Sequence, residues 1–149
     1  MSAVNNQVFL ALATVAWANG DLSADERAGI LSAARSAGYS EPELADLSKA
    51  IEIPRELSSL SLHRLSALDR VFTYAAGEWL ARLEGTVGPK EAAALKALGD
   101  VLKMSETARA NARQSVQDIA KLPTGAKPDR YDFAKLREAL ERSMQAKGR

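Results

Sequence analysis

Two stretches of the sequence share one pattern of residue types, and this internal repeat limits the folds that the chain can adopt. Residues 17–26 read WANGDLSADE, and residues 82–91, 65 positions later, read RLEGTVGPKE. Each copy follows an apolar run and precedes a run that is rich in alanine and leucine. The match extends further, with Ile30 opposite Leu95 and Ser40 opposite Ser105. The pattern predicts two copies of a helix–turn–helix unit packed into one core.

The composition favours helices in a single domain. A chain of 149 residues is long enough to bury a full core. Alanine and leucine dominate the apolar residues, whereas aromatic residues make up only 5%, and such a mixture has high helix propensity. The 20 basic and 19 acidic residues nearly balance, so no overall field attracts nucleic acid or a membrane surface. Cysteine is absent, which excludes disulfides, thiolate nucleophiles and cysteine-bound metals.

Apolar periodicity and capping signals predict helices along nearly the whole chain, and no strand pattern appears. Ser-x-x-Glu pairs, which open helices as capping boxes, occur at Ser23 and at Ser40. Glycines fit the left-handed position that closes a helix, and Gly20 follows the first predicted helix. The predicted helices cover about 3–18, 23–38, 62–83, 105–121 and 131–145, with two more beginning at 40 and 89. The fold class is therefore an all-α bundle of about seven helices, built from two repeated units.

The predicted domain organisation follows from this pattern. Residues 1–122 form the helical domain, with the repeat at about 5–50 and 70–120. Residues 123–128 contain two prolines and a glycine and form a short linker. Residues 129–149 carry an amphipathic helix. Its apolar stripe packs either onto its own bundle, which we favour, or onto another chain.

The apolar run at residues 8–18 is a candidate targeting segment that we interpret as a buried helix. It falls far short of the roughly 20 residues that span a bilayer. No lysine or arginine precedes it, as a secretory signal requires. We therefore predict a cytoplasmic protein without direct membrane insertion.

Catalytic chemistry has no positive signal in the sequence. His63 is the sole histidine and has no second histidine or cysteine with which to bind a transition metal. No glycine-rich phosphate loop and no Gly-x-Ser-x-Gly elbow is present. The sequence predicts a protein that is not an enzyme, with His63 at a surface or boundary.

Acidic residues gather at the two repeated turns and form the one candidate site. They are Asp21, Asp25, Glu26, Glu84 and Glu91. If the two turns approach each other, these carboxylates offer an oxygen-rich site for a divalent cation. The alternative is that Glu26 and Glu91 cap their helices and that acids in a first turn complement the helix dipole. Both interpretations remain open at this stage.

A helix that ends in Ala-x-Asp-Gly, followed by a hydrophobic residue and Ser-x-x-Glu, resembles the signature of the tellurite-resistance TerB-like family. The matching stretches are residues 18–26 (ANGDLSADE) and 83–91 (LEGTVGPKE). The chain departs from the signature at Asn19 and Glu84, where the family has aspartate, and at Gly88, where it has a capping serine. The resemblance covers about residues 5–120 and implies an all-helical fold.

The resemblance also implies a function in bacterial tellurite or general stress tolerance. Similar proteins look like non-catalytic adaptors, some of which work with a membrane-associated partner. We therefore expect an interaction or scaffold module with a protein partner, compatible with a homo-oligomer and without nucleic-acid binding. The alternative is a stress protein that binds a divalent cation at the acidic turns, with that cation as its only cofactor.

Overall fold

The structure is a computed structural model that describes residues 6–20, 22–54, 56–60, 62, 65–81, 88–120 and 133–147. These residues form seven α-helices and two short 3-10 helices, and none of them lies in a strand. The elements are α1 (Asn6–Ala16), η1 (Trp17–Asn19), α2 (Ala24–Ser36), α3 (Glu41–Ile51), η2 (Leu57–Ser59), α4 (Ala67–Ala81), α5 (Pro89–Val101), α6 (Glu106–Ala120) and α7 (Phe133–Lys147). For this part of the chain, the predicted all-α class with about seven helices is confirmed.

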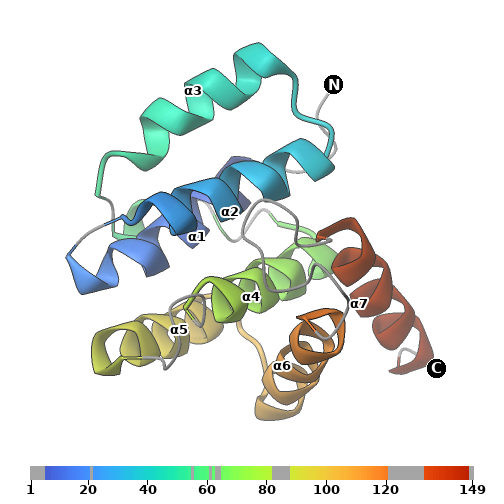
Figure 1. Ribbon diagram of the computed structural model, residues 1–149. Coiled ribbons are helices and arrows are strands. Elements are labelled where there is room, and N and C mark those ends of the chain that lie inside the picture. Colours follow the sequence, from blue (N-terminus) through green and yellow to red (C-terminus); the bar gives the residue numbers. More distant parts are fainter. Residues whose placement is uncertain are drawn as a thin grey trace.

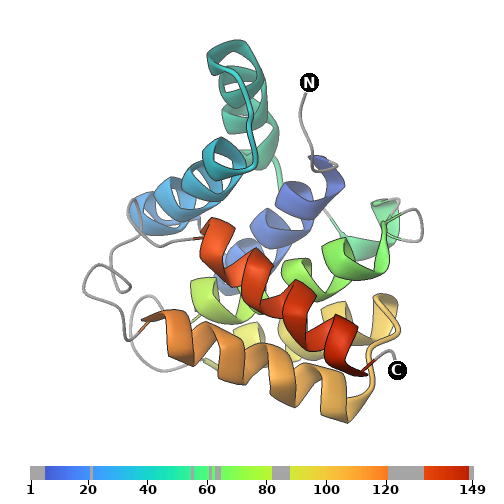
Figure 2. The same ribbon diagram turned by 90° about the vertical axis from the view of Figure 1, so that its right-hand side faces the viewer.

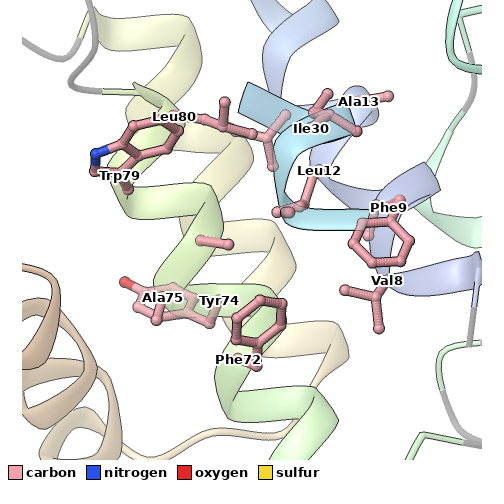
Figure 3. Close-up of a cluster of buried hydrophobic side chains, with 14 of the residues drawn as sticks. Val8, Phe9, Leu12, Ala13, Ile30, Phe72, Tyr74, Ala75, Trp79 and Leu80 are labelled. Carbon is pink, nitrogen blue, oxygen red and sulfur yellow. The ribbon is translucent and has the colours of Figure 1, made fainter. Parts of the chain in front are cut away.

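Two apolar helices, α1 and α4, form the centre of the protein. Every residue of α1 from Val8 to Ala13 is buried, and so is every residue of α4 from Phe72 to Ala81. A helix that is buried on all sides must be enclosed by other helices. Accordingly, α1 contacts α2, α3, α4 and α5, while α4 also contacts α5, α6 and α7 (Figure 1). Figure 3 shows part of this core, where side chains of α1 and α4 meet Ile30 of α2.

No helix in the described ranges is both long enough and apolar enough to cross a bilayer.

The predicted capping boxes of α2 and α3 are confirmed. The Ser23 Oγ accepts a hydrogen bond from the Glu26 N–H at 3.1 Å, and Glu26 Oε1 accepts one from the Ser23 N–H at 3.0 Å. Ser40 and Glu43 make the same pair of bonds at the start of α3. These bonds satisfy amides that have no partner within the helix. The residue types at the two helix starts therefore fix where each helix begins.

Left-handed glycines close the first two helical segments. Gly20 follows η1 with φ 88°, and its N–H donates to the Trp17 carbonyl. Gly38 follows α2 with φ 98°, and the next amide, that of Tyr39, donates to the Ala34 carbonyl. This is the pattern of a Schellman motif, which reverses the chain after α2.

The long central helix starts later than its sequence pattern predicts. The apolar spacing predicts a helix over 62–83, whereas α4 begins at Ala67. Ser66 is the reason, because its Oγ accepts from the Asp69 N–H and its carbonyl accepts from the Arg70 N–H. Leu62 and Leu65 are buried although they precede the helix. The apolar spacing therefore extends to the N-terminal side of the helix cap at Ser66. The predicted end at Leu83 lies outside the described residues.

The C-terminal helix α7 packs onto its own bundle, as we favoured from the sequence. Figure 2 shows α7 lying across α4 and α6, and α2 also contacts it. The buried Phe133 ring meets the Trp79 ring edge-to-face, with centroids 5.0 Å apart. Arg137 forms an ion pair with the buried Asp69 and lies 5.5 Å over the Phe72 ring. The apolar stripe of α7 is thus covered within the chain.

A close contact between α2 and α4 generates the first testable prediction. A Cβ atom at Gly29 would lie 2.8 Å from Trp79 Cζ3, on a ring held by Phe133. A Cβ atom at Gly77 would instead meet leucine methyl ends at 3.3 Å or more. Replacing glycine with alanine raises helix propensity equally at the two positions. The difference in stability between the two variants therefore measures the cost of overpacking at Gly29. We expect Gly29→Ala to be about 1–3 kcal/mol less stable than Gly77→Ala in urea unfolding, and equal stabilities would contradict the close contact.

Candidate functional site

The predicted acidic site is only partly within the described structure. Asp25 and Glu26 lie in the first turn of α2, and Glu91 lies in the first turn of α5. Asp21 and Glu84 lie outside the described residues, as does His63. No group of three or more acidic or histidine side chains placed to hold a metal ion occurs among residues that the structure describes. The divalent-cation site therefore stays a prediction.

The two equivalent glutamates are both buried, with 6% of each exposed. Glu26 uses one carboxylate oxygen to accept the Ser23 N–H and so acts in capping. Gly88 precedes α5 and provides no side-chain cap for Glu91. The capping interpretation thus accounts for the contact between Glu26 and Ser23. Glu91 occupies the equivalent helix position and is equally buried, but it has no capping box.

A different constellation, absent from the sequence-based candidates, lines a cleft of about 380 Å³ between α4, α5 and α6. Three of its lining residues are cationic, namely Lys96, Arg109 and Arg113. Glu78 and Glu106 are anionic, and Tyr74 is the aromatic member. Ala92 and Leu95 of α5 supply apolar surface. We call this feature the charged cleft.

A buried polar network forms the α4 side of the charged cleft. The Tyr74 hydroxyl donates to Glu78 Oε2 at 2.8 Å, and Arg113 Nη1 donates to the Tyr74 oxygen at 3.0 Å. The same Nη1 lies 3.5 Å from Glu78 Oε2, so Arg113 offsets the charge of this carboxylate. Tyr74 and Glu78 are one helical turn apart, which places both on the α6 side of α4. Burial, reinforced by the hydrogen bond to Glu78, raises the pKa of Tyr74 to about 12.

Arg109 forms a second network where α5 meets α6. Its Nη2 donates to Asp100 Oδ1 at 2.8 Å and its Nε donates to the Met104 carbonyl at 3.1 Å. Glu106 lies 3.9 Å from Nη1. The hydrogen bond to Asp100 raises the pKa of this guanidinium, which stays charged. A Cβ atom at Gly99 would lie 2.6 Å from Arg109 Cζ, so glycine leaves the space that the guanidinium occupies.

Lys96 carries the uncompensated charge of the charged cleft. Its side chain is exposed and makes no ion pair or hydrogen bond with any described residue. Arg113 engages Tyr74 and Glu78 through Nη1, and Arg109 engages Asp100 and Glu106. A positive charge on α5 thus faces solvent beside two cation–carboxylate networks.

The polar groups on the α4 side of the charged cleft are engaged with one another. A tyrosine whose pKa is about 12 stays protonated at neutral pH and cannot act as a base there. The Glu78 carboxylate is held by Tyr74 and Arg113. Lys96 is the lining cation that makes no ion pair or hydrogen bond with another described residue.

Sequence reasoning missed this cleft, although one signal was present. On α6 the buried positions are Arg109, Ala112 and Val116, so an arginine occupies an otherwise apolar stripe. Periodicity alone predicts that such a residue lies at the boundary of the core. Only the contacts of Arg109 with Asp100 and Met104 show how its charge is accommodated.

The described residues form an all-helical bundle with a cleft lined by charged and apolar side chains. Comparison with protein-family models, curated proteins and solved structures finds no match to this chain.

The Tyr74 network predicts a late tyrosine ionisation. Because the pKa of Tyr74 in the folded protein, about 12, exceeds the usual tyrosine value of 10.0, the network's contribution to stability is complete below pH 10 and is lost as the pH rises through about 12. In an ultraviolet titration we expect one of the three tyrosines to ionise last. Tyr74→Phe should remove that last step and leave the other two, and loss of an earlier step instead would contradict the assignment.

The divalent-cation prediction is tested by melting temperature. A cation that binds the native state must raise the melting temperature in a saturable manner. If the acidic turns bind an ion, calcium, magnesium, manganese or zinc should raise it relative to EDTA. Glu26→Gln combined with Glu91→Gln should abolish that rise, and loss of the Glu26 cap should cost about 1 kcal/mol of stability. No rise with any of these ions would leave Glu26 as a helix cap and Glu91 without a role in ion binding.

Proposed function

We propose that this protein is a non-enzymatic TerB-like module of bacterial stress or tellurite resistance, which acts by docking a protein partner. The observation that carries the proposal is the charged cleft, in which Tyr74, Glu78 and Arg113 hold one another and Lys96 is left exposed. Such a site can recognise a charged group but lacks a base poised for catalysis. The family context comes from the resemblance at residues 18–26 and 83–91.

Helix boundaries support the repeated architecture that belongs to this proposal. The helices α2 and α5 each have 13 residues and start at Ala24 and Pro89, 65 positions apart. The helices α3 and α6 start at Glu41 and Glu106, again 65 positions apart. We infer that α1–α3 and α4–α6 are two copies of one three-helix unit.

Burial and capping support the same inference. The buried residues of α3 are Leu44, Leu47 and Ile51, and the buried residues of α6 lie 65 positions later, at Arg109, Ala112 and Val116. Both α2 and α5 end in a Schellman motif, although the second places Lys103 rather than glycine at the left-handed position, with φ 59°. Ser105 caps α6 through the Ala108 N–H, as Ser40 caps α3.

The partner in this proposal is a protein, in keeping with the adaptor role that the resemblance implies. A membrane-associated partner and a cytoplasmic location belong to the same proposal. The basic residues of α7 do not suggest nucleic-acid binding, because acidic residues alternate with them and Arg142 lies 4.0 Å from Glu138.

The proposal is tested by complementation in a bacterial strain that lacks this gene. We expect the deletion to increase sensitivity to tellurite and the wild-type gene to restore tolerance. Lys96→Glu should lose most of that rescue because it reverses the free charge of the charged cleft. Lys90→Glu is the matched control, since it makes the same exchange at an exposed position of α5 outside the cleft. A deletion without effect would remove the stress role, and full rescue by Lys96→Glu would exclude the cleft from it.

A further inference from the structure

We propose that the charged cleft binds a carboxylate presented on an apolar peptide segment of the partner. This inference rests on the proposed docking function and names the ligand chemistry of the same site. Lys96 and the outer edge of Arg113 receive the carboxylate, and Leu95 with Ala92 contacts the neighbouring apolar side chain.

Comparison of the two halves of the chain shows that the charged cleft is specific to the second half. Five of the eight lining residues are charged or more polar than the residue 65 positions earlier, two keep their character (Ile30 and Leu95, Glu41 and Glu106), and Ala92 replaces the charged Arg27. The five pairs that become more polar are Phe9 and Tyr74, Ala13 and Glu78, Leu31 and Lys96, Leu44 and Arg109, and Ser48 and Arg113. In the first half Phe9, Ala13 and Leu44 are simply core residues. The fold therefore accepts an apolar interface between its first and third helices.

The polar interface is the more costly of the two. Glu78 is 4% exposed and Arg109 is 8% exposed, and taking such charges out of water costs several kcal/mol that their mutual attraction does not always recover. An apolar core at the equivalent positions of the first half avoids this cost. Stability alone therefore does not explain why the second half carries charges here.

A companion exchange indicates that the second half is built around these charges. Gly99 lies opposite Ala34 in the 65-residue alignment. A Cβ atom at Gly99 would come within 2.6–2.9 Å of three atoms of the Arg109 side chain. The second half thus has Arg109 where the first half has Leu44, and Gly99 where the first half has Ala34. The two changes together make room for a guanidinium, which then holds the start of α6 through Asp100 and the Met104 carbonyl.

The position of Lys96, rather than a net charge, favours an anion, because the three cations are matched in number by Glu78, Asp100 and Glu106. Glu78 is offset by Arg113, and Arg109 is offset by Asp100 and Glu106. Lys96 is offset by no described side chain. The Arg113 side chain is 35% exposed, and its Nε and Nη2 groups make no hydrogen bond with described residues. Lys96 on α5 and Arg113 on α6 both carry cationic N–H donors, which form the stronger hydrogen bonds with a carboxylate.

The shape of the charged cleft favours a peptide over a free small acid. Sites for small molecules usually bury most of the ligand's surface. Here Ala92, Lys96 and Glu106 are exposed, so the walls cannot enclose a ligand. A volume of about 380 Å³ accepts one or two side chains that a larger partner presents. The apolar Leu95 favours an aliphatic neighbour of the acidic residue.

Selection from a random peptide library displayed on phage tests this inference with the full-length protein. We expect enriched peptides to carry glutamate or aspartate beside aliphatic residues. For a selected peptide, glutamine in place of the acidic residue should weaken binding about tenfold or more, the range for a charge-assisted hydrogen bond. Lys96→Glu should weaken binding of the same peptide to a similar degree, and Lys90→Glu should leave it unchanged. Rising salt should weaken the wild-type interaction.

Several outcomes would overturn the inference. Absence of enrichment, enrichment of basic or uncharged peptides, or equal binding of the glutamate and glutamine peptides would each exclude the carboxylate. Hexanoate serves as a small-acid probe by nuclear magnetic resonance. If it shifts the signals of Lys96 and Leu95 while no acidic peptide binds, the ligand is a small acid rather than a partner segment. If complementation still fails with Lys96→Glu while acidic peptides do not bind, the docking function stands and only this ligand chemistry falls.

Discussion

The packing of α1 against α4 is the contact on which the rest of the structure depends. Both helices are buried around their whole circumference over more than one turn, from Val8 to Ala13 and from Phe72 to Ala81. Two helices of this kind cannot cover each other completely, so further helices must cover their remaining faces. The surrounding helices do so, and close approach is aided by Gly29 against Trp79 and Gly77 against Leu95. The bundle is therefore organised from the inside outwards.

The same central pair also positions the charged cleft. Tyr74 and Glu78 belong to the buried part of α4, and their polar ends meet Arg113 of α6. Since α4 is fixed by the core, these groups are held in place before any ligand arrives. A preorganised site loses less conformational freedom on binding. The proposed recognition of a carboxylate thus depends on the rigidity of a helix whose other faces have a purely structural role.

The acidic turns and the charged cleft represent two ways in which this chain uses buried charge. Glu26 lies at a helix start and satisfies an amide of Ser23, so its charge complements the helix dipole. Glu78 lies within α4, where Tyr74 and Arg113 contact its carboxylate. Capping contacts are local in sequence. The contacts of Glu78 and Arg113 join residues 35 positions apart, which no local pattern reveals.

The sequence by itself determined the helical class, the capped starts at Ser23 and Ser40, the turn at Gly20 and the amphipathic face of α7, because each depends on neighbours within a few residues. The start of α4 predicted from the sequence was too early, because the apolar spacing continues on the N-terminal side of Ser66 and conceals the helix cap at that residue. Tertiary structure alone decided that α7 covers α4 and that Arg109 and Arg113 meet α5 and α4. The physical reason is that charge compensation and enclosure act between segments distant in the chain, and only the packed helices bring them together.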